Sequence, residues 1–250
     1  MQRYFVPYEN WNGDTVSIKQ DDYHHIVRVM RMKIGNQVVV VHPKDGAAIT
    51  TIVDINDNSV TCRIDSWPDY DTELPVDVTI GQGVPKGEKW EWILQKGTEL
   101  GAKQFISFQA ERSVVKWDER KLVKKTSRWE KIVKEASEQS HRNFIPSVQW
   151  MNRWEEFLEY SKTFDIRLFA YEEEAKHLSS VSLHSVYQTI NPGAKILICI
   201  GPEGGFSEKE ARDLRSHEFQ SIRLGPRILR TETAPLYALA SLSYYFEEMR

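Results

Sequence analysis

The strongest constraint on the fold is a change in hydrophobic pattern near residue 75. Beyond it, five segments rich in apolar residues are candidate strands: 76–81, 105–108, 166–171, 195–200 and 221–224. Five helix-length segments lie between and after them: 89–100, 121–140, 154–161, 208–217 and 232–249. Strands that alternate with helices are typical of an α/β domain on a largely parallel sheet. The sequence therefore predicts one such domain over residues 76–250.

The first 70 residues have a different pattern. Four short runs predict strands separated by Gly, Asn and Asp turns: 15–18, 37–42, 48–55 and 59–66. A helical insertion is expected at 21–31, where Asp21 or Asp22 can cap the helix. We therefore predict a small β-barrel domain at 1–70. Prolines and acidic residues before residue 76 indicate a linker at 71–75.

Composition narrows the classes of function. No apolar run has the length of a membrane span, and the N-terminus lacks a signal-peptide pattern, so a cytoplasmic protein without a membrane role is expected. Cys62 and Cys199 lie in apolar strand segments, as buried reduced thiols do. The seven histidines lack metal-ligand spacing, so no metal is expected.

The net charge of -3 is distributed unevenly. From Arg112 to Arg142 the chain carries ten Lys or Arg residues against five acids, a local excess of five positive charges. A basic face for nucleic acid is one interpretation. The other is a solvated helix with internal Glu–Lys pairs. Charge alone leaves both open.

A glycine-rich segment, Ile200–Ser207, follows an apolar strand and precedes a helix. Its glycines can bring backbone amides close to a ligand. Such a turn can also be purely structural, with Ser207 and Glu210 forming a capping box. The segment matches neither the dinucleotide fingerprint nor the P-loop, which disfavours a nucleotide-dependent metabolic enzyme.

A second segment, Leu224–Ala234, has the same strand–loop–helix position. Arg227 and Arg230 lie in it before the start of the last helix, although the arginines can simply face solvent and the threonines can simply cap. Since both segments follow the carboxyl ends of strands, they fit one crevice better than either does alone.

The last predicted helix is apolar nearly all round, with Leu, Tyr, Ala and Phe on most faces. Such a helix needs burial on two sides. A partner subunit can cover one side, and a deep core within a single chain is an almost equally good explanation.

In order and spacing, segments along nearly the whole chain resemble the RsmE family of ribosomal RNA uridine-N3 methyltransferases, in the SPOUT superfamily. The segments are Arg3–Val6, His25–Arg31, Gln95–Gly101, Glu111–Val115, Glu135–Arg142, Ile200–Ser207 and Leu224–Ala234. The resemblance implies a PUA-like β-barrel for RNA docking, followed by a SPOUT (α/β knot) methyltransferase domain with a deep C-terminal trefoil knot, against the usual rule that chains do not thread loops. It also implies S-adenosylmethionine as methyl donor, 16S rRNA of the small ribosomal subunit as partner, and a homodimer.

The resemblance further implies roles for individual residues. The donor pocket is expected to comprise Tyr171, Gly201, Pro202, Glu203, Gly204, Leu224, Gly225, Ile228, Leu229, Thr231, Glu232 and Ala234. Contacts to RNA are expected from Arg28, Arg31, Arg112, Gln139 and Arg142. We expect Arg230 to stabilise a uracil anion, with Glu138 as a weaker candidate for catalysis. The alternatives are a SPOUT methyltransferase with another RNA target and a non-catalytic RNA-binding or ribosome-assembly factor.

Overall fold

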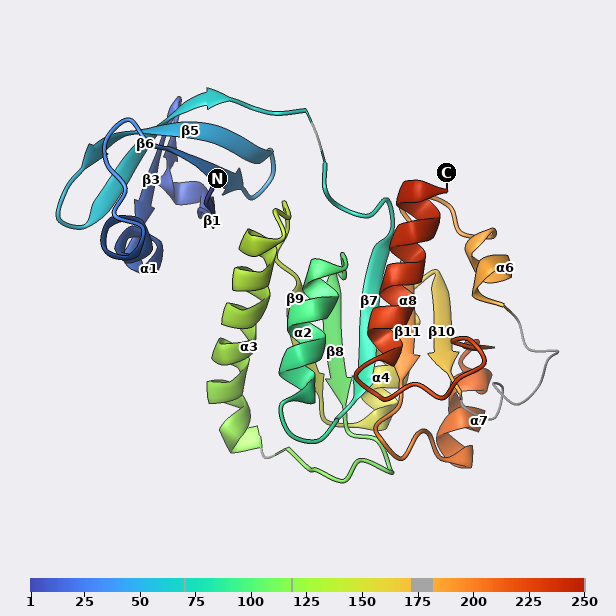
Figure 1. Ribbon diagram of the computed structural model, residues 1–250. Helices are drawn as coiled ribbons and strands as arrows, with labels where there is room; N and C mark the ends of the chain where they lie inside the picture. Colours follow the sequence, from blue (N-terminus) through green and yellow to red (C-terminus); the bar gives the residue numbers. More distant parts are fainter. Residues whose placement is uncertain (70, 118, 172–181, 250) are drawn as a thin grey trace. The chain divides into compact units, whose positions relative to one another are not determined.

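The computed structural model describes residues 1–69, 71–117, 119–171 and 182–249 (Figure 1). The chain divides into two compact units. The first comprises Met1–Glu73 together with Ser137–Phe144, and the second comprises Leu74–Ala136 and Ile145–Arg250. Each unit has its own sheet and its own core.

The first unit is built on a six-stranded sheet. Its strands, in spatial order, are β1 (Arg3–Phe5), β4 (Gln37–His42), β5 (Gly46–Ile55), β6 (Ser59–Ser66), β3 (Thr15–Lys19) and β2 (Trp11–Asn12). The pairs are antiparallel except β1 with β4. Val16 of β3 and Ile52 of β5 alternate with exposed or half-buried neighbours and fill the core, as the period of two predicts, whereas β4 is buried from Val38 to His42.

The predicted helix at 21–31 is shorter than expected. α1 spans Gln20–His24, and one π-helical turn, η2, continues it over His25–Val29. Arg31 then takes a positive φ of 52°, which ends the helical backbone. A further turn of 3-10 helix, η1, covers Tyr8–Asn10.

The second unit is an all-parallel, six-stranded sheet. In spatial order its strands are β12 (Gln220–Ile222), β10 (Ile166–Ala170), β11 (Lys195–Ile200), β7 (Asp77–Gly83), β8 (Gln104–Phe108) and β9 (Ser147–Met151). The predicted alternation of strands and helices over this part of the chain is confirmed. Because every pair is parallel, the carboxyl ends of all six strands lie at one edge of the sheet.

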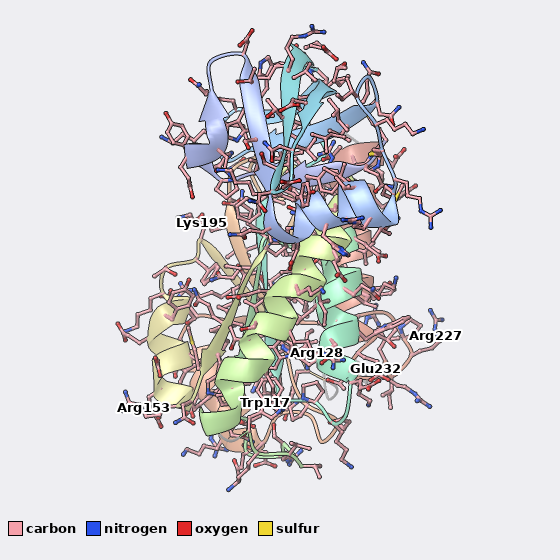
Figure 2. All side chains as sticks on the ribbon, turned by 90° about the vertical axis from the view of Figure 1, so that its left-hand side faces the viewer. Trp117, Arg128, Arg153, Lys195, Arg227 and Glu232 are labelled. Atoms are coloured by element: carbon pink, nitrogen blue, oxygen red, sulfur yellow. The ribbon has the colours of Figure 1, made fainter. Side chains whose placement is uncertain are left out.

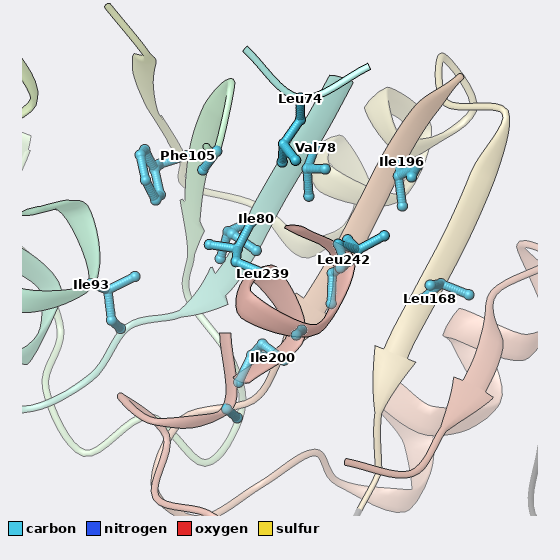
Figure 3. Close-up of a cluster of buried hydrophobic side chains, with 14 of the residues drawn as sticks. Leu74, Val78, Ile80, Ile93, Phe105, Leu168, Ile196, Ile200, Leu239 and Leu242 are labelled. Atoms are coloured by element: carbon cyan, nitrogen blue, oxygen red, sulfur yellow. The ribbon is translucent and has the colours of Figure 1, made fainter. Parts of the chain in front are cut away.

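Helices pack on both faces of this sheet. They are α2 (Lys89–Glu99), α3 (Glu119–Gln139), α4 (Trp154–Ser161), α6 (Leu183–Tyr187), α7 (Glu208–Ser216) and α8 (Ala234–Ser243), which the π-helical turn η3 extends over Tyr244–Glu248. On one face, Ile93 of α2 and Leu239 of α8 pack with Ile80 of β7 (Figure 3). On the other face, Phe157 of α4 and Leu214 of α7 close a second cluster.

Three strands and one helix were not expected from the sequence: β1, β2, β9 and α6. β1 and β2 have three and two residues, too few for a hydrophobic period to show. β9 and β2 are edge strands, which have only one neighbour and need less apolar surface. The last helix begins at Ala234 rather than at residue 232, with Pro235 in its first turn.

Candidate functional site

The two loops singled out in the sequence line one cavity in the second unit. Its volume is about 560 Å³, and it lies beyond the carboxyl ends of β10, β11 and β12. Eleven of the residues expected in the donor pocket line it: Tyr171, Gly201, Pro202, Glu203, Gly204, Leu224, Gly225, Ile228, Leu229, Thr231 and Ala234. Glu232 does not line the cavity itself, but it forms an ion pair with Lys89, which is a lining residue.

The loop after β11 is fixed by close backbone packing. A Cβ on Gly83 would lie 2.6 Å from Pro202 Cδ, and a Cβ on Gly201 would lie 3.0 Å from the carbonyl carbon of Gly205. Gly205 has a positive φ of 65°, a conformation that favours glycine. The glycines therefore allow the chain to fold back on itself beside the end of β7.

The expected capping box at the start of α7 is confirmed. Ser207 Oγ accepts a hydrogen bond from Glu210 N at 3.2 Å, and Glu210 Oε2 accepts one from Ser207 N at 2.8 Å. The second carboxylate oxygen of Glu210 accepts a hydrogen bond from Glu111 N at 2.8 Å. This buried glutamate therefore joins the loop after β8 to the loop that lines the cavity.

A buried polar network ties both loops to β7. Gln82 Nε2 donates to Gly201 O at 3.1 Å and to Thr231 Oγ1 at 2.9 Å. Thr231 Oγ1 in turn donates to Gly201 O at 2.7 Å. Both side chains are buried, so these hydrogen bonds are shielded from water. The network fixes the spacing of the two loops at the floor of the site.

An ion-pair bridge connects the same two loops at a second place. Lys89 Nζ lies 2.9 Å from Glu203 Oε1 and 3.0 Å from Glu232 Oε2. Burial acts to raise the pKa of Glu203, but the hydrogen bonds from Lys89 and from the backbone N–H of Lys86 outweigh it and lower the pKa. The hydrogen bond to Glu203 raises the pKa of Lys89. Lys89 and Glu203 therefore hold each other in their charged forms.

The arginines around the cavity differ in their contacts. Arg112, expected to contact RNA, lines the cavity, and its Nη1 donates to Gly204 O at 3.2 Å. Arg230 and Arg227 also line the cavity and are exposed; Arg227 is labelled in Figure 2. Within the described part of the chain, no hydrogen bond or ion pair holds either guanidinium. Arg230 is thus available to a ligand.

The other residues expected to contact RNA lie in the first unit. Arg28 and Arg31 are exposed on η2 and just after it, and Gln139 is exposed at the end of α3. Glu138, the weaker catalytic candidate, is half-buried and also belongs to this unit. None of these residues lines the cavity of the second unit.

The placement of Arg142 corrects one expectation. Its side chain is 3% exposed, and its guanidinium forms an ion pair with Glu73. Its Nε donates to both carboxylate oxygens of Glu73 at 3.2 and 3.3 Å. Arg3 Nη1 donates to the carbonyl oxygen of Arg142 at 2.8 Å. Because a paired, buried guanidinium is not presented to solvent, Arg142 stabilises the first unit rather than offering a surface for RNA.

Sequence reasoning did not find two residues that organise the site. Gln82 and Lys89 contact the loops from positions more than 100 residues away along the chain. No local motif marks either residue, because their role depends on the pairing of β7 with β11. The cavity also includes Ala170, Ile200, Phe206 and Ile222, which had been expected only as parts of strands or loops.

Two negative findings concern the described residues alone. No group of three or more His, Cys, Asp or Glu side chains among them is arranged to hold a metal ion. No helix among them combines the length and the apolar character that crossing a membrane requires.

Comparison with known proteins agrees with this architecture. Residues 72–243 match the model of an RNA methyltransferase domain, and residues 18–65 match that of an RNA methyltransferase PUA domain. The chain is 44% identical to ribosomal RNA small subunit methyltransferase E of Bacillus subtilis (strain 168), over 100% of this chain and 99% of that protein.

Solved structures show the same fold. A ribosomal RNA small subunit methyltransferase E from Neisseria gonorrhoeae, bound to S-adenosylmethionine, superposes with a TM-score of 0.84 at 29% identity over 98% of each chain. A Legionella pneumophila methyltransferase in complex with S-adenosylmethionine gives a TM-score of 0.80 at 31% identity over 96% of each chain.

Proposed function

We propose that this chain, which belongs to the ribosomal RNA small subunit methyltransferase E family, transfers the methyl group of S-adenosylmethionine to N3 of a uridine in 16S rRNA. It is an S-adenosylmethionine-dependent ribosomal RNA methyltransferase with a PUA domain followed by a SPOUT-type domain. The single observation that carries the proposal is the cavity at the carboxyl ends of β10–β12, where both loops and Arg230 meet. The trefoil knot remains a prediction.

The residues present fit the methyl donor. The volume of about 560 Å³ lies within the usual range for small-molecule sites, roughly 300 to 1,000 Å³. Gly201, Gly204 and Gly225 leave backbone groups accessible along the wall. When bound, S-adenosylmethionine supplies an electrophilic methyl group on a positively charged sulfur. Glu203, whose pKa is lowered despite the effect of burial, supplies a carboxylate to a wall of the same cavity.

Methylation at N3 requires that the uracil imide lose its proton, because the neutral nitrogen has no free lone pair for in-line attack. Arg230 lines the cavity without a partner in the described part of the chain. We assign it to the uracil carbonyl oxygen on which negative charge develops. Removal of one such donor costs on the order of 10² to 10³ in rate. Glu138 remains the weaker candidate for catalysis, as proton acceptor.

RNA docking is assigned to residues 1–70, joined by a linker at 71–75 to the catalytic domain at 76–250. Arg28 and Arg31 are exposed there, with Val29 and Met30 exposed between them. Cations bind the phosphates, while exposed apolar groups can contact unpaired bases. With the small ribosomal subunit as substrate, the protein acts in the cytoplasm.

A homodimer is the second part of the proposal. The last helix presents Tyr237 and Tyr244, 39% and 60% exposed, seven residues apart and therefore on one face. Ala240, between them, is exposed as well. Trp92 on α2, which contacts α8, is 51% exposed. An exposed aromatic face of this kind is typical of a surface covered by a partner.

The reaction is tested with purified protein and labelled S-adenosylmethionine, offered unmodified small subunits or their extracted 16S rRNA. Nucleoside mass spectrometry identifies the product, and N3-methyluridine is expected. A different methylated nucleoside would contradict the assigned target atom. Donor binding without methylation of either substrate would favour the alternatives, another RNA target or a non-catalytic binding factor.

The role of Arg230 is tested separately. Arg230→Ala should lower kcat by about 10² to 10³ while the Kd for S-adenosylmethionine changes little, because the guanidinium acts on uracil. Arg153→Ala, a change at an exposed arginine before α4, is the matched control. Equal losses of donor binding and turnover would instead make Arg230 a residue of the donor site.

A further inference from the structure

Lys89 lies where two cavities of the second unit meet. It is the first residue of α2, and it lines both the donor-site cavity of about 560 Å³ and a neighbouring cavity of about 770 Å³. The neighbouring cavity lies along α2 and α3 and also includes Trp92, Arg128 and Glu232. Lys89 is therefore part of the wall between the two spaces. Figure 2 labels Glu232 beside the same end of α2.

The contacts of Lys89 join the two loops of the donor site through one atom. Nζ is 2.9 Å from Glu203 Oε1, in the loop after β11, and 3.0 Å from Glu232 Oε2, in the loop before α8. Two carboxylates repel each other, so the ammonium of Lys89 between Glu203 and Glu232 favours their approach. Lys89 thus acts as a bridge across the open side of the loops.

The ion pairs of Lys89 are partly shielded from solvent, which strengthens them. The side chains of Lys89, Glu203 and Glu232 are 31%, 24% and 18% exposed. Glu203 Oε1 also accepts a hydrogen bond from Lys86 N at 3.1 Å, so both the start of α2 and the segment before it hold this carboxylate. Charge-assisted hydrogen bonds with several partners are stronger than an isolated surface pair.

We infer that Lys89 is a positioning residue of the methyl-donor site: its ammonium holds the two donor loops together and closes the wall between the two cavities. The inference rests on the proposed function, since the ligand of the first cavity is taken to be S-adenosylmethionine. Without the ammonium, Glu203 and Glu232 repel each other, and the donor site opens toward the cavity along α2 and α3. The buried network of Gln82 and Thr231 still holds the loops at the floor, so the fold is retained.

The test is the affinity for S-adenosylmethionine of the full chain carrying Lys89→Met, measured by isothermal titration calorimetry. Methionine keeps the length of the side chain and removes its charge. Loss of charge-assisted hydrogen bonds predicts a Kd raised about tenfold or more. Stopped-flow measurements should assign the change to faster dissociation. The donor KM should rise with the Kd, while the KM for RNA stays unchanged.

Two further variants separate positioning from general stability. Lys96→Met removes a lysine of the same helix whose ion pair, with Glu99 at 2.8 Å, stays within that helix. It should leave the donor Kd unchanged, because neither Lys96 nor Glu99 lines the donor-site cavity. Lys89→Arg, which keeps a cation between the two carboxylates, should restore part of the affinity.

Each outcome decides between the two proposals. Wild-type protein that binds the donor, together with an unchanged Kd in Lys89→Met, would overturn the inference about Lys89 and leave the proposed function standing. Equal loss of affinity in Lys96→Met and Lys89→Met would also overturn it, because the effect would then be general. Wild-type protein that does not bind S-adenosylmethionine would overturn the proposed function and, with it, this inference.

Discussion

A single methyl group at Gly83 should displace the donor loop. Gly83 ends β7, and a Cβ there would lie 2.6 Å from Pro202 Cδ and 2.8 Å from Pro202 N. Ordinary contact begins at 3.4 Å, so Pro202 would have to retreat by about 0.8 Å. Because part of the obstacle is backbone, the loop after β11 must move as a whole.

Two consequences are expected for Gly83→Ala. Overpacking should cost about 1 to 3 kcal/mol of stability. Displacement of the loop by nearly 1 Å should also misplace the donor, and a shift of this size can reduce the rate by about 10². Calorimetric titration with S-adenosylmethionine and single-turnover methylation measure the two effects on function, and thermal unfolding measures the stability.

Gly81→Ala provides the matched control on the same strand. A Cβ at Gly81 would lie 3.1 Å from the ring of Phe157 and 3.3 Å from Leu197 Cδ1, and these are side chains of the core beneath α4. This variant should lose stability and keep donor affinity. Wild-type donor affinity in Gly83→Ala, or an equal loss of affinity in both variants, would refute the argument.

Three further predictions concern other contacts. Thr231→Val should cost about 1 to 3 kcal/mol, because it removes two buried hydrogen bonds, one from Gln82 Nε2 and one to Gly201 O; unchanged urea unfolding would contradict the network. Glu73→Ala should cost about 3 to 5 kcal/mol in the first unit by removing the carboxylate that pairs with the buried guanidinium of Arg142, and hydrogen exchange there should rise; unaltered protection would show that the pair is dispensable. The pKa of Glu203 is lowered in the folded state although burial acts to raise it, so the ionised carboxylate stabilises the fold at neutral pH, and this stabilisation is lost as the pH falls below 4.5. The melting temperatures of wild type and Glu203→Gln should therefore differ at pH 7 and converge in acid, and a constant difference would count against the ion pair.

The sequence predicts most of the second unit because the signals there are local. The strand at 195–200 has apolar side chains from Ile196 to Ile200, and it is observed over the predicted residues. A serine followed three residues later by a glutamate can form a capping box, so Ser207 and Glu210 predict the start of a helix. The structure has the complete capping box. The common position of the two loops follows from the parallel sheet alone.

Long-range contacts explain what the sequence did not predict. Gln82 and Thr231 are 149 residues apart, so no window of sequence relates them. The resemblance implies an RNA contact for Arg142, and the residues around it are basic, yet Glu73, 69 residues earlier, pairs with its buried guanidinium. Lys89 is the first residue of a helix, and no local sequence motif marks it. Its role depends on its ion pairs with Glu203 and Glu232, which lie in two distant loops. Burial and pairing of charges are properties of the folded chain.

The most direct test of the central claim is a crystal structure of the protein with S-adenosylmethionine. The donor is predicted in the cavity between the loops at 201–205 and 225–231, with Lys89 bridging Glu203 and Glu232 beside it. Electron density for the donor at any other place, with this cavity empty, would contradict the assignment of the site and the mechanism built on it.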